Sequence, residues 1–318
     1  MSHMQASEKG KLSTEPYKGV RDFYPEDMAV QNYIFSVWRT VAEKFGYEEY
    51  AASLLEPVEL YRSKGSDEIV NEQMFTFKDR GDREVALRPE MTPSLARMVA
   101  AKRKSLKFPL RWYSIPNCFR YERPQRGRRR EHWQLNADLV GIAGVEAEVE
   151  IISLAHHIMK EFGADDSDFE IRIGAKGIIT EKLNQKNISE EHHKKIFQLI
   201  DKKGKMPEEE RMLELKNLGV DFEITESAHV KQLRVLLTKK GVKNTEFDPH
   251  IVRGFDYYTG MVFEVFDTHE ENRRSLFGGG RYDNLLEMFG VEPVPTVGFG
   301  MGDVTIRDFL ETHGLRLK

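Results

Sequence analysis

Cysteine is almost missing from this sequence: Cys118 stands alone among 318 residues. One cysteine cannot form an internal disulfide, and it excludes zinc sites built from several thiolates. No charged and then apolar leader is recognisable at the start, so secretion is not expected. No run of 18 apolar residues occurs, so no membrane span is expected either. These absences predict a reducing, cytoplasmic location.

An excess of either charge is also missing, since 48 basic residues stand against 52 acidic ones and the net charge is −4. Such a chain is not a general polyanion binder, so contact with nucleic acid would need a local basic patch. Hydrophobic residues make up 40% of the chain, which is enough to build a core and excludes global disorder.

The chain divides into regions of different composition. Residues 1–16 have no periodic apolar pattern and begin like an expression tag, so they are expected to form a disordered tail. Residues 17–175 and 246–318 carry short strands and long helices, and we assign them to one core. Residues 176–245 are rich in lysine and glutamate and predict a small helical insertion. Strands clustered towards both ends of the chain predict the α+β class, with an antiparallel sheet flanked by helices.

Local patterns predict the main elements. Ile34, Trp38 and Val41 recur at helical spacing behind Pro25, which predicts a helix over 25–45. Further helices are predicted over 92–100 with Thr92 as the cap, and over 146–162, 227–240 and 304–312. Strands are predicted over 74–77, 84–87, 110–121, 133–140, 169–173, 251–253 and 261–266.

The strand predicted over 133–140 has two unlike faces. Gln134, Asn136 and Asp138 share one face, and the residues between them are apolar or aromatic. The polar face carries no lysine. It therefore fits the floor of a polar cleft at least as well as a face turned to water.

The densest chemical signal is the segment 120–130, which holds six arginines in eleven residues. A solvated basic loop is the common interpretation of such a run. However, guanidinium groups pair with phosphate oxygens in a bidentate way, and Arg120 at a strand end could be held rigidly. The polar strand that follows favours a loop that grips phosphate.

Two shorter segments are also candidates. In the segment 88–92, Glu90 is well placed to receive an ammonium group, although a structural role before a helix is the alternative. The segment 253–260 holds an arginine, an aspartate and two tyrosines before a strand, and packing in a turn explains it equally well. Glycines at 278–280, 298 and 300 would let a flat ring lie close to the strands that carry them.

Taken together, these residues make the chain resemble the histidyl-tRNA synthetases, which are class II aminoacyl-tRNA synthetases. The resemblance covers nearly all of the chain from Gly19 onward. It rests on GVRDFYPEDM (19–28), LRPEMT (87–92), FRYERPQRGRRREHWQLNADLVG (119–141), RGFDYYTGMVFE (253–264), FGGGRYDNL (277–285) and PTVGFGMGD (295–303).

The resemblance implies a reaction in two steps. L-histidine attacks the α-phosphate of ATP, which comes with Mg²⁺, and histidyl-adenylate and pyrophosphate form. The 3′ end of histidine tRNA then takes the histidyl group. The family works as a homodimer, and its helical insertion touches tRNA.

The resemblance also implies roles for particular residues. Arg120 and Arg253 would face the α-phosphate from two sides and, with Gln134, form the catalytic set. The residues implied for binding histidine are Glu90, Thr92, Gln134, Asp138, Arg253, Tyr257 and Tyr258. Those implied for binding ATP are Arg120, Glu122, Arg128 and Arg307. No resident metal is implied.

The sequence departs from the family pattern in four ways. Thr305 stands where many members have an arginine that stacks on ATP, and Arg307 is the nearest candidate to replace it. Ser53 stands in place of an interface proline, and Asp138 in place of glutamate. The chain also ends soon after its last predicted helix, so the family's C-terminal anticodon-binding domain is expected to be absent, by truncation or naturally.

Two other functions remain open. One is the non-catalytic regulatory subunit of ATP phosphoribosyltransferase, a histidine sensor that resembles the synthetase. Such paralogues usually degrade the 253–260 segment and the arginines of 120–130, and both are intact here. The other is a free-standing adenylating enzyme that passes histidine to an acceptor other than tRNA.

Overall fold

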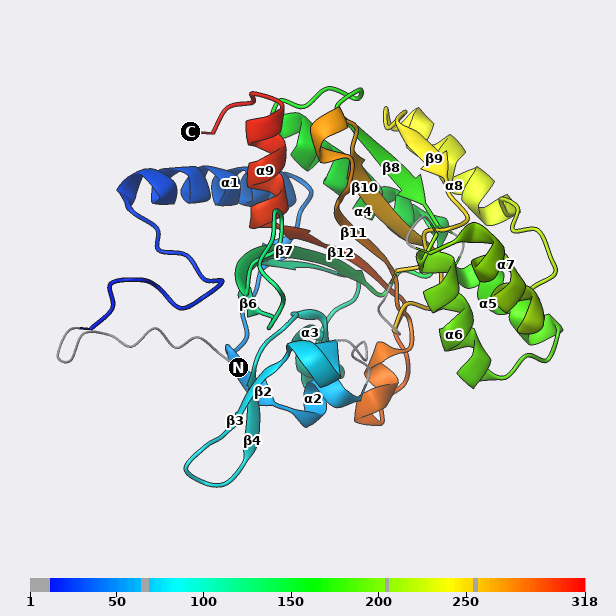
Figure 1. The fold of residues 1–318 in the computed structure, drawn as a ribbon, viewed down its shortest axis with the longest axis horizontal. Helices are drawn as coiled ribbons and strands as arrows, with labels where there is room; N and C mark the ends of the chain where they lie inside the picture. Colours follow the sequence, from blue (N-terminus) through cyan, green and yellow to red (C-terminus); the bar gives the residue numbers. More distant parts are fainter. Residues whose placement is uncertain (1–11, 64–68, 175, 204–205, 254–256, 318) are drawn as a thin grey trace.

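Strands from distant parts of the chain pair in one central sheet (Figure 1). The computed structural model describes residues 12–63, 69–174, 176–203, 206–253 and 257–317. The strands of this sheet are β1 (Glu48–Glu49), β5 (Leu110–Ser114), β6 (Asn117–Phe119), β7 (Glu131–Val140), β8 (Phe169–Ile173), β9 (Thr245–Phe247), β10 (Val262–Asp267), β11 (Ser275–Arg281) and β12 (Thr296–Gly302).

The strand order within the described residues is β1-β5-β7-β12-β11-β10-β8-β9, with β6 paired to β7 outside this path. Pairing is antiparallel from β5 to β8. Among the strands of the described residues, only the edge pairs β1–β5 and β8–β9 are parallel. The predicted α+β class with an antiparallel sheet is confirmed, and the parallel edge strands are an addition to it.

A second, smaller sheet lies beside the first. It has the order β2-β4-β3, from β2 (Leu55–Pro57), β3 (Phe75–Lys78) and β4 (Glu84–Leu87). The strands predicted over 74–77 and 84–87 are therefore confirmed, and they pair as an antiparallel hairpin. The short helix α2 (Glu59–Arg62) and α3 (Thr92–Lys102) pack nearby, and single helical turns span Ile69–Gln73, Glu270–Asn272 and Leu285–Phe289.

One face of the central sheet packs against helices that contribute to the largest hydrophobic core. They are α1 (Pro25–Lys44), α4 (Val145–Glu161), α8 (Ala228–Lys239) and α9 (Asp303–Thr312). The predicted stripe on α1 is buried, with Ile34 and Trp38 fully enclosed. Apolar residues at helical spacing thus direct this helix onto the sheet and leave the opposite sheet face for other contacts.

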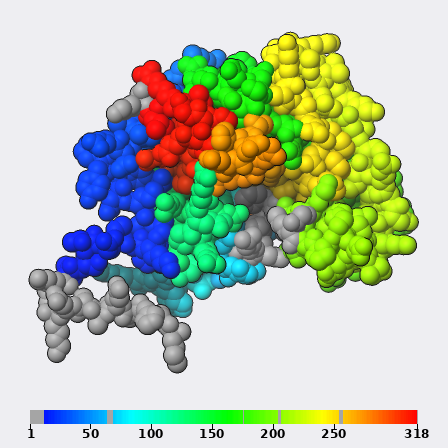
Figure 2. Space-filling model, turned by 45° about the horizontal axis from the view of Figure 1, so that its top comes forward, coloured from blue at the N-terminus to red at the C-terminus, as the bar shows by residue number. Residues whose placement is uncertain are grey.

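The predicted insertion divides according to its packing. Helices α5 (Lys176–Gln185), α6 (Glu190–Asp201) and α7 (Glu208–Asn217) share a small core of their own. In Figure 2 they form one flank of the molecule. By contrast, Val230, Leu233 and Leu237 of α8 pack in the main core, against α4. The range 176–245 therefore joins a separate three-helix unit to a helix of the main body.

Two local predictions were wrong. Residues 251–253 form no strand, and the edge strand lies instead at β9, where it pairs with β8. Thr92 does not cap α3, because Met91 occupies the cap position and Thr92 is the first helical residue. The predicted tail over 1–16 lies largely outside the described residues. No helix of the described chain combines the length and apolar character that crossing a membrane requires.

Candidate active site

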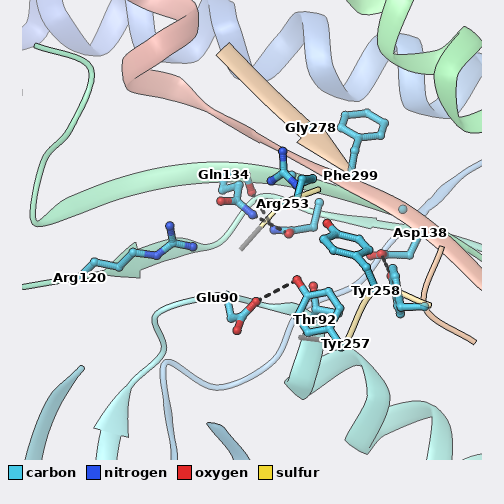
Figure 3. Close-up of a pocket in the computed structure, with 14 residues that line it drawn as sticks. Glu90, Thr92, Arg120, Gln134, Asp138, Arg253, Tyr257, Tyr258, Gly278 and Phe299 are labelled. Carbon is cyan, nitrogen blue, oxygen red and sulfur yellow. Dashed lines mark hydrogen bonds between the residues drawn. The ribbon is translucent and has the colours of Figure 1, made fainter. Parts of the chain in front are cut away.

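A cleft opens on the sheet face opposite the helices (Figure 3). Its cavity volume is about 70 Å³, smaller than that of most small-molecule sites. Side chains from β7 meet there with residues at the start of α3, with Arg120 after β6 and with residues that precede β10, while β11 and β12 contribute glycines. The cleft is lined by Glu90, Thr92, Arg120, Gln134, Asn136, Asp138, Arg253, Tyr257, Tyr258, Gly278, Tyr282, Gly298, Phe299 and Gly300.

The floor of the cleft is the polar face of β7. Leu135, Ala137 and Leu139 pack in the main core, so the alternate residues must face the other way. Asn136 and Asp138 are buried there and line the cleft together with Gln134. The cleft-floor interpretation of this strand is therefore confirmed, and the water-facing interpretation is wrong.

Glycines in β11 and β12 make the space for these polar side chains. Gly298 pairs directly with Asp138, and a Cβ on Gly298 would overlap the Asp138 carboxylate. A Cβ on Gly278 would overlap the Arg253 guanidinium. Close approach of functional groups to the backbone thus explains why the strands carry glycine, a residue that otherwise weakens a strand.

Two buried carboxyl groups, Glu90 and Asp138, lie in the cleft. The Tyr257 hydroxyl donates a hydrogen bond of 3.1 Å to Glu90 Oε2, and the Tyr282 hydroxyl donates to Asp138 Oδ1. Burial raises the pKa of Glu90 to about 7, opposed by the nearby Arg120 and by the Tyr257 hydrogen bond. Burial likewise raises the pKa of Asp138 to about 7, opposed by the Tyr282 hydrogen bond.

The second oxygen of each carboxyl group, Glu90 Oε1 and Asp138 Oδ2, is buried and has no hydrogen-bond partner among the described residues. Buried polar atoms are normally paired, because leaving one unpaired costs about 1–3 kcal/mol. Both oxygens are therefore ready acceptors for a ligand that carries N–H groups.

Two arginines supply positive charge from separate segments. Arg120 follows β6, and its Nε donates to the Pro89 carbonyl oxygen at 2.9 Å, which fixes the side chain. Arg253 forms an ion pair with Glu264 at 3.0 Å, and its φ of +52° lies in the left-handed region. A non-glycine residue there costs on the order of 1–3 kcal/mol and persists only where its surroundings hold it. Arg253 Nε is buried and unpaired within the described chain, so this guanidinium can accept an anion.

Three tyrosines form one wall of the cleft. The ring centroids of Tyr257 and Tyr258 lie 4.9 Å apart, and the Tyr282 ring lies 5.5 Å from Tyr257 and 6.2 Å from Tyr258. All three side chains are buried. The wall combines flat apolar faces with hydroxyl groups, which suits a small aromatic ring that also carries hydrogen-bonding atoms.

Most of the residues singled out in the sequence come together here. The cleft gathers Glu90, Thr92, Arg120, Gln134, Asp138, Arg253, Tyr257 and Tyr258. Glu122 and Arg128 lie outside its lining and pair with each other at 3.3 Å on the basic loop. The residues 254–256, between Arg253 and Tyr257, fall outside the described chain.

Arg307 is not brought to the cleft. It pairs with Asp27 at 3.1 Å and with Glu311 at 2.8 Å on α9. Thr305 faces β11, where its hydroxyl donates to the Leu276 carbonyl oxygen at 2.8 Å. A residue two positions along a helix points roughly 200° away, so Arg307 faces a different side from Thr305.

The lining side chain of Tyr282 was missed, and Asn136 was placed on the polar face of its strand without a binding role. Phe299 is also among the lining residues, but its side chain packs in the main core. Asn136 had a signal, because it belongs to the polar face of β7. Tyr282 reaches Asp138 only because β11, β12 and β7 pair side by side. No local pattern in the sequence reports that pairing. Within the described chain, no group of three or more His, Cys, Asp or Glu side chains could hold a metal ion.

Solved structures share this fold. A crystal structure of histidyl-tRNA synthetase from Nostoc sp. PCC 7120 matches with a TM-score of 0.79 at 22% identity, and the match covers 97% of this chain and 78% of that one. An ATP phosphoribosyltransferase regulatory subunit/histidyl-tRNA synthetase from Bacillus halodurans matches with a TM-score of 0.76 at 25% identity, over 95% and 84% of the two chains. The fold is that of the class II aminoacyl-tRNA synthetases.

Sequence relatives narrow the class to one family. The family model for histidyl-tRNA synthetase matches residues 19–222 and 208–304. A histidine–tRNA ligase of Leptospira biflexa is 45% identical over 96% of this chain and 76% of its own length. A chloroplastic/mitochondrial histidine–tRNA ligase of Arabidopsis thaliana is 39% identical over 96% of this chain and 68% of its own. The chain belongs to the histidyl-tRNA synthetase family.

Proposed function

We propose that this chain is the catalytic core of a histidine–tRNA ligase, which activates L-histidine with ATP and transfers it to histidine tRNA. The observation that carries the proposal is one cleft with two kinds of unpaired buried group. Glu90 and Asp138 offer acceptor oxygens, and Arg253 offers a donor nitrogen. An amino acid that has an ammonium group, a ring N–H and a carboxylate would satisfy all three.

Histidine recognition follows from these groups. We assign the ammonium group to Glu90 with Thr92, and the imidazole to Asp138 within the wall of Tyr257 and Tyr258. An apolar amino acid would leave the buried oxygens unpaired. Sites built to hydrogen-bond a polar substrate reject analogues that lack the polar group by factors of about 10⁴–10⁵.

Activation requires stabilisation of charge at phosphorus. A carboxylate oxygen of histidine attacks the α-phosphorus of ATP, and the bond to the bridging oxygen of pyrophosphate breaks. Arg120 and Arg253 carry fixed positive charge on separate segments that line the same cleft, and such preorganised cations lower this kind of barrier. We assign Gln134 a contact with both reactants. Mg²⁺ enters bound to the ATP phosphates, as part of the substrate.

Other parts of the function are proposed on the basis of family membership. Glu122 and Arg128 would help to bind ATP from the basic loop. The helices α5 to α7 would contact tRNA, and the active form would be a homodimer. We expect the enzyme to work in the cytoplasm, where its tRNA takes part in translation.

The runner-up is a histidine-sensing regulatory subunit, because the Bacillus halodurans structure of that description shares the fold. A sensor that binds only histidine does not require both of the arginines that line the cleft. The ligase therefore explains Arg120 and Arg253 better.

Exchange of labelled pyrophosphate into ATP, measured without tRNA, tests the proposal. Exchange that depends on histidine, and not on other amino acids, would support the adenylation chemistry. Histidine binding by calorimetry with no exchange would instead favour the sensor. Exchange without charging of histidine tRNA would favour an adenylating enzyme with another acceptor.

A further inference from the structure

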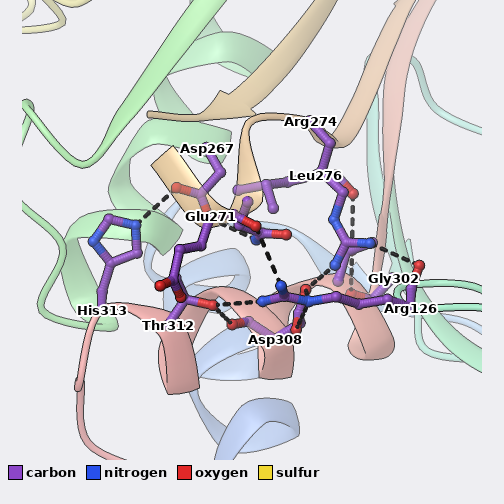
Figure 4. Close-up of polar contacts among 11 residues, drawn as sticks. Arg126, Asp267, Glu271, Arg274, Leu276, Gly302, Asp308, Thr312 and His313 are labelled. Carbon is purple, nitrogen blue, oxygen red and sulfur yellow. Dashed lines mark hydrogen bonds and ion pairs between the residues drawn. The ribbon is translucent and has the colours of Figure 1, made fainter. Parts of the chain in front are cut away.

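The basic loop is tied to α9 by a cluster outside the cleft (Figure 4). Arg126, near the tip of the loop, forms an ion pair from Nε to Asp308 Oδ1 at 2.9 Å. Its Nη2 donates to Thr312 Oγ1 at 3.0 Å, and its Nη1 donates to the Glu271 carbonyl oxygen at 3.2 Å. One side chain of the loop thus contacts α9 and the turn that precedes β11.

Arg274, at the turn before β11, holds the backbone of the same loop. Its Nη1 donates to the Arg126 carbonyl oxygen at 2.7 Å, and its Nη2 pairs with the Asp308 carboxylate. Gly127 lies against this guanidinium, and a Cβ there would overlap it. Because the bond goes to a main-chain oxygen, Arg274 constrains the path of the loop and not only one side chain.

Asp308 is the shared partner of both arginines. Its side chain is 18% exposed, compared with 27% for Arg274 and 52% for Arg126. Burial, together with the positive charge of Arg126, lowers the pKa of Arg274. Without the Asp308 carboxylate, two like charges would face each other in a partly buried place, so the cluster depends on this one anion.

The helix that carries Asp308 is rigidly attached to the core. Ile306, Phe309 and Leu310 of α9 are fully buried, and Thr305 bonds to β11. The loop begins at Arg120, which lines the cleft. The ion pair between Glu122 and Arg128 lies between this base and the part of the loop that contacts α9.

We propose that Arg126, Arg274 and Asp308 form a clamp that fixes the basic loop against α9 and so holds Arg120, at the base of the loop, in place at the cleft. Asp308 and Arg274 are then positioning residues for ATP, acting through Arg120 and Arg128 without touching the nucleotide. This inference rests on the proposed function.

Trypsin reports the clamp directly, because the loop contains five arginines after Arg120. In Asp308→Asn, we expect cleavage within 123–130, located by mass spectrometry, to be roughly tenfold faster than in the unmodified protein. Asp308 pairs with both Arg126 and Arg274, so at least the factor expected for the loss of one charge-assisted hydrogen bond should appear. Glu311→Gln, on the same helix, is the matched control. Equal cleavage rates in the loop, or faster cleavage over the whole chain together with a lower Tm, would overturn the clamp.

Pyrophosphate exchange measures the effect of the clamp on the KM for ATP. We expect Arg274→Gln to raise the KM for ATP roughly tenfold, with the KM for histidine unchanged and with partial recovery in Arg274→Lys. Arg273→Gln, at the exposed neighbouring arginine, is the matched control. An unchanged KM for ATP in Arg274→Gln, with normal exchange by the unmodified protein, would overturn the inference alone. No histidine-dependent exchange by the unmodified protein would overturn the proposed function instead, and the trypsin result would still stand.

Discussion

The floor of the cleft and the three-helix insertion are built on opposite principles. On the floor, β7, β11 and β12 enclose polar side chains on one face while their other face packs in the main core. The insertion closes a small core of its own and leaves Met212 and Leu213 more than half exposed.

The two regions should therefore differ in how strongly a substitution affects activity. On the floor, even a small substitution contacts a buried polar group. An unpaired buried polar group is costly in free energy, so such a substitution should have a large effect. In the insertion, a substitution alters the packing of a separate core. Its effect on stability should therefore stay within that unit. Substitutions in the two regions should therefore differ widely in their effect on pyrophosphate exchange.

Removal of a cleft cation should have the largest effect. We expect Arg253→Ala to lower histidine-dependent exchange by roughly 10³-fold, since charge stabilisation at the reacting centre is lost. The Tm should change little, because the left-handed backbone at position 253 disfavours arginine and alanine alike, and the space left by the side chain opens into the cleft. Near-normal exchange in this variant would remove Arg253 from the proposed mechanism.

Filling the space above a floor glycine should come next. A Cβ on Gly300 would overlap the Gln134 amide and no backbone atom. We expect Gly300→Ala to lower kcat/KM for exchange roughly tenfold to hundredfold, because a misplaced contact costs about that much. Gly302→Ala on the same strand is the control, since a Cβ there would make only ordinary contact with Thr305. Equal kinetics in the two variants would contradict the close-approach explanation.

The raised pKa of Glu90 predicts a pH effect. The ionised form attracts an ammonium group, and that form is lost as the pH falls through about 7. The KM for histidine should therefore rise up to roughly tenfold for each pH unit below 7. Glu90→Gln should have a higher KM that varies less with pH. A KM for histidine that is flat from pH 8 to pH 6 in the unmodified protein would argue against Glu90 as the ammonium partner.

A change in the insertion core should have the smallest effect on exchange. Leu215 is buried between α7 and its neighbours. We expect Leu215→Ala to destabilise the insertion by about 2–5 kcal/mol, with exchange changed less than about twofold. Hydrogen exchange should speed up in α6 and α7 but not in β7 or β12. A large loss of pyrophosphate exchange would mean that the two regions are coupled.

Local patterns were enough to predict many of the elements. The apolar residues at helical spacing on α1 and the alternating apolar and polar residues on β7 can each be recognised within a short segment. Both predicted elements are confirmed. Predictions failed where a window was ambiguous. The apolar residues Ile251 and Val252 read as a strand, but Val252 packs in the insertion core instead. Likewise, no local pattern near Thr305 indicated that Arg307 would pair with Asp27.

Contacts between distant residues required the tertiary structure. Tyr257 and Glu90 are 167 residues apart, Tyr282 and Asp138 are 144 apart, and Arg126 and Asp308 are 182 apart. Strand order and register decide which of these side chains come into contact. Neither can be predicted from the hydrophobic periodicity of a short segment.

The sequence by itself singled out the arginines, carboxylates and glycines that line the cleft, because these residue types stand out in its motifs. Only the tertiary structure decided which of them share a cleft, which are tied elsewhere and which carboxyl groups have a raised pKa. The physical reason is that burial, pairing and close approach depend on neighbours contributed by other strands and helices.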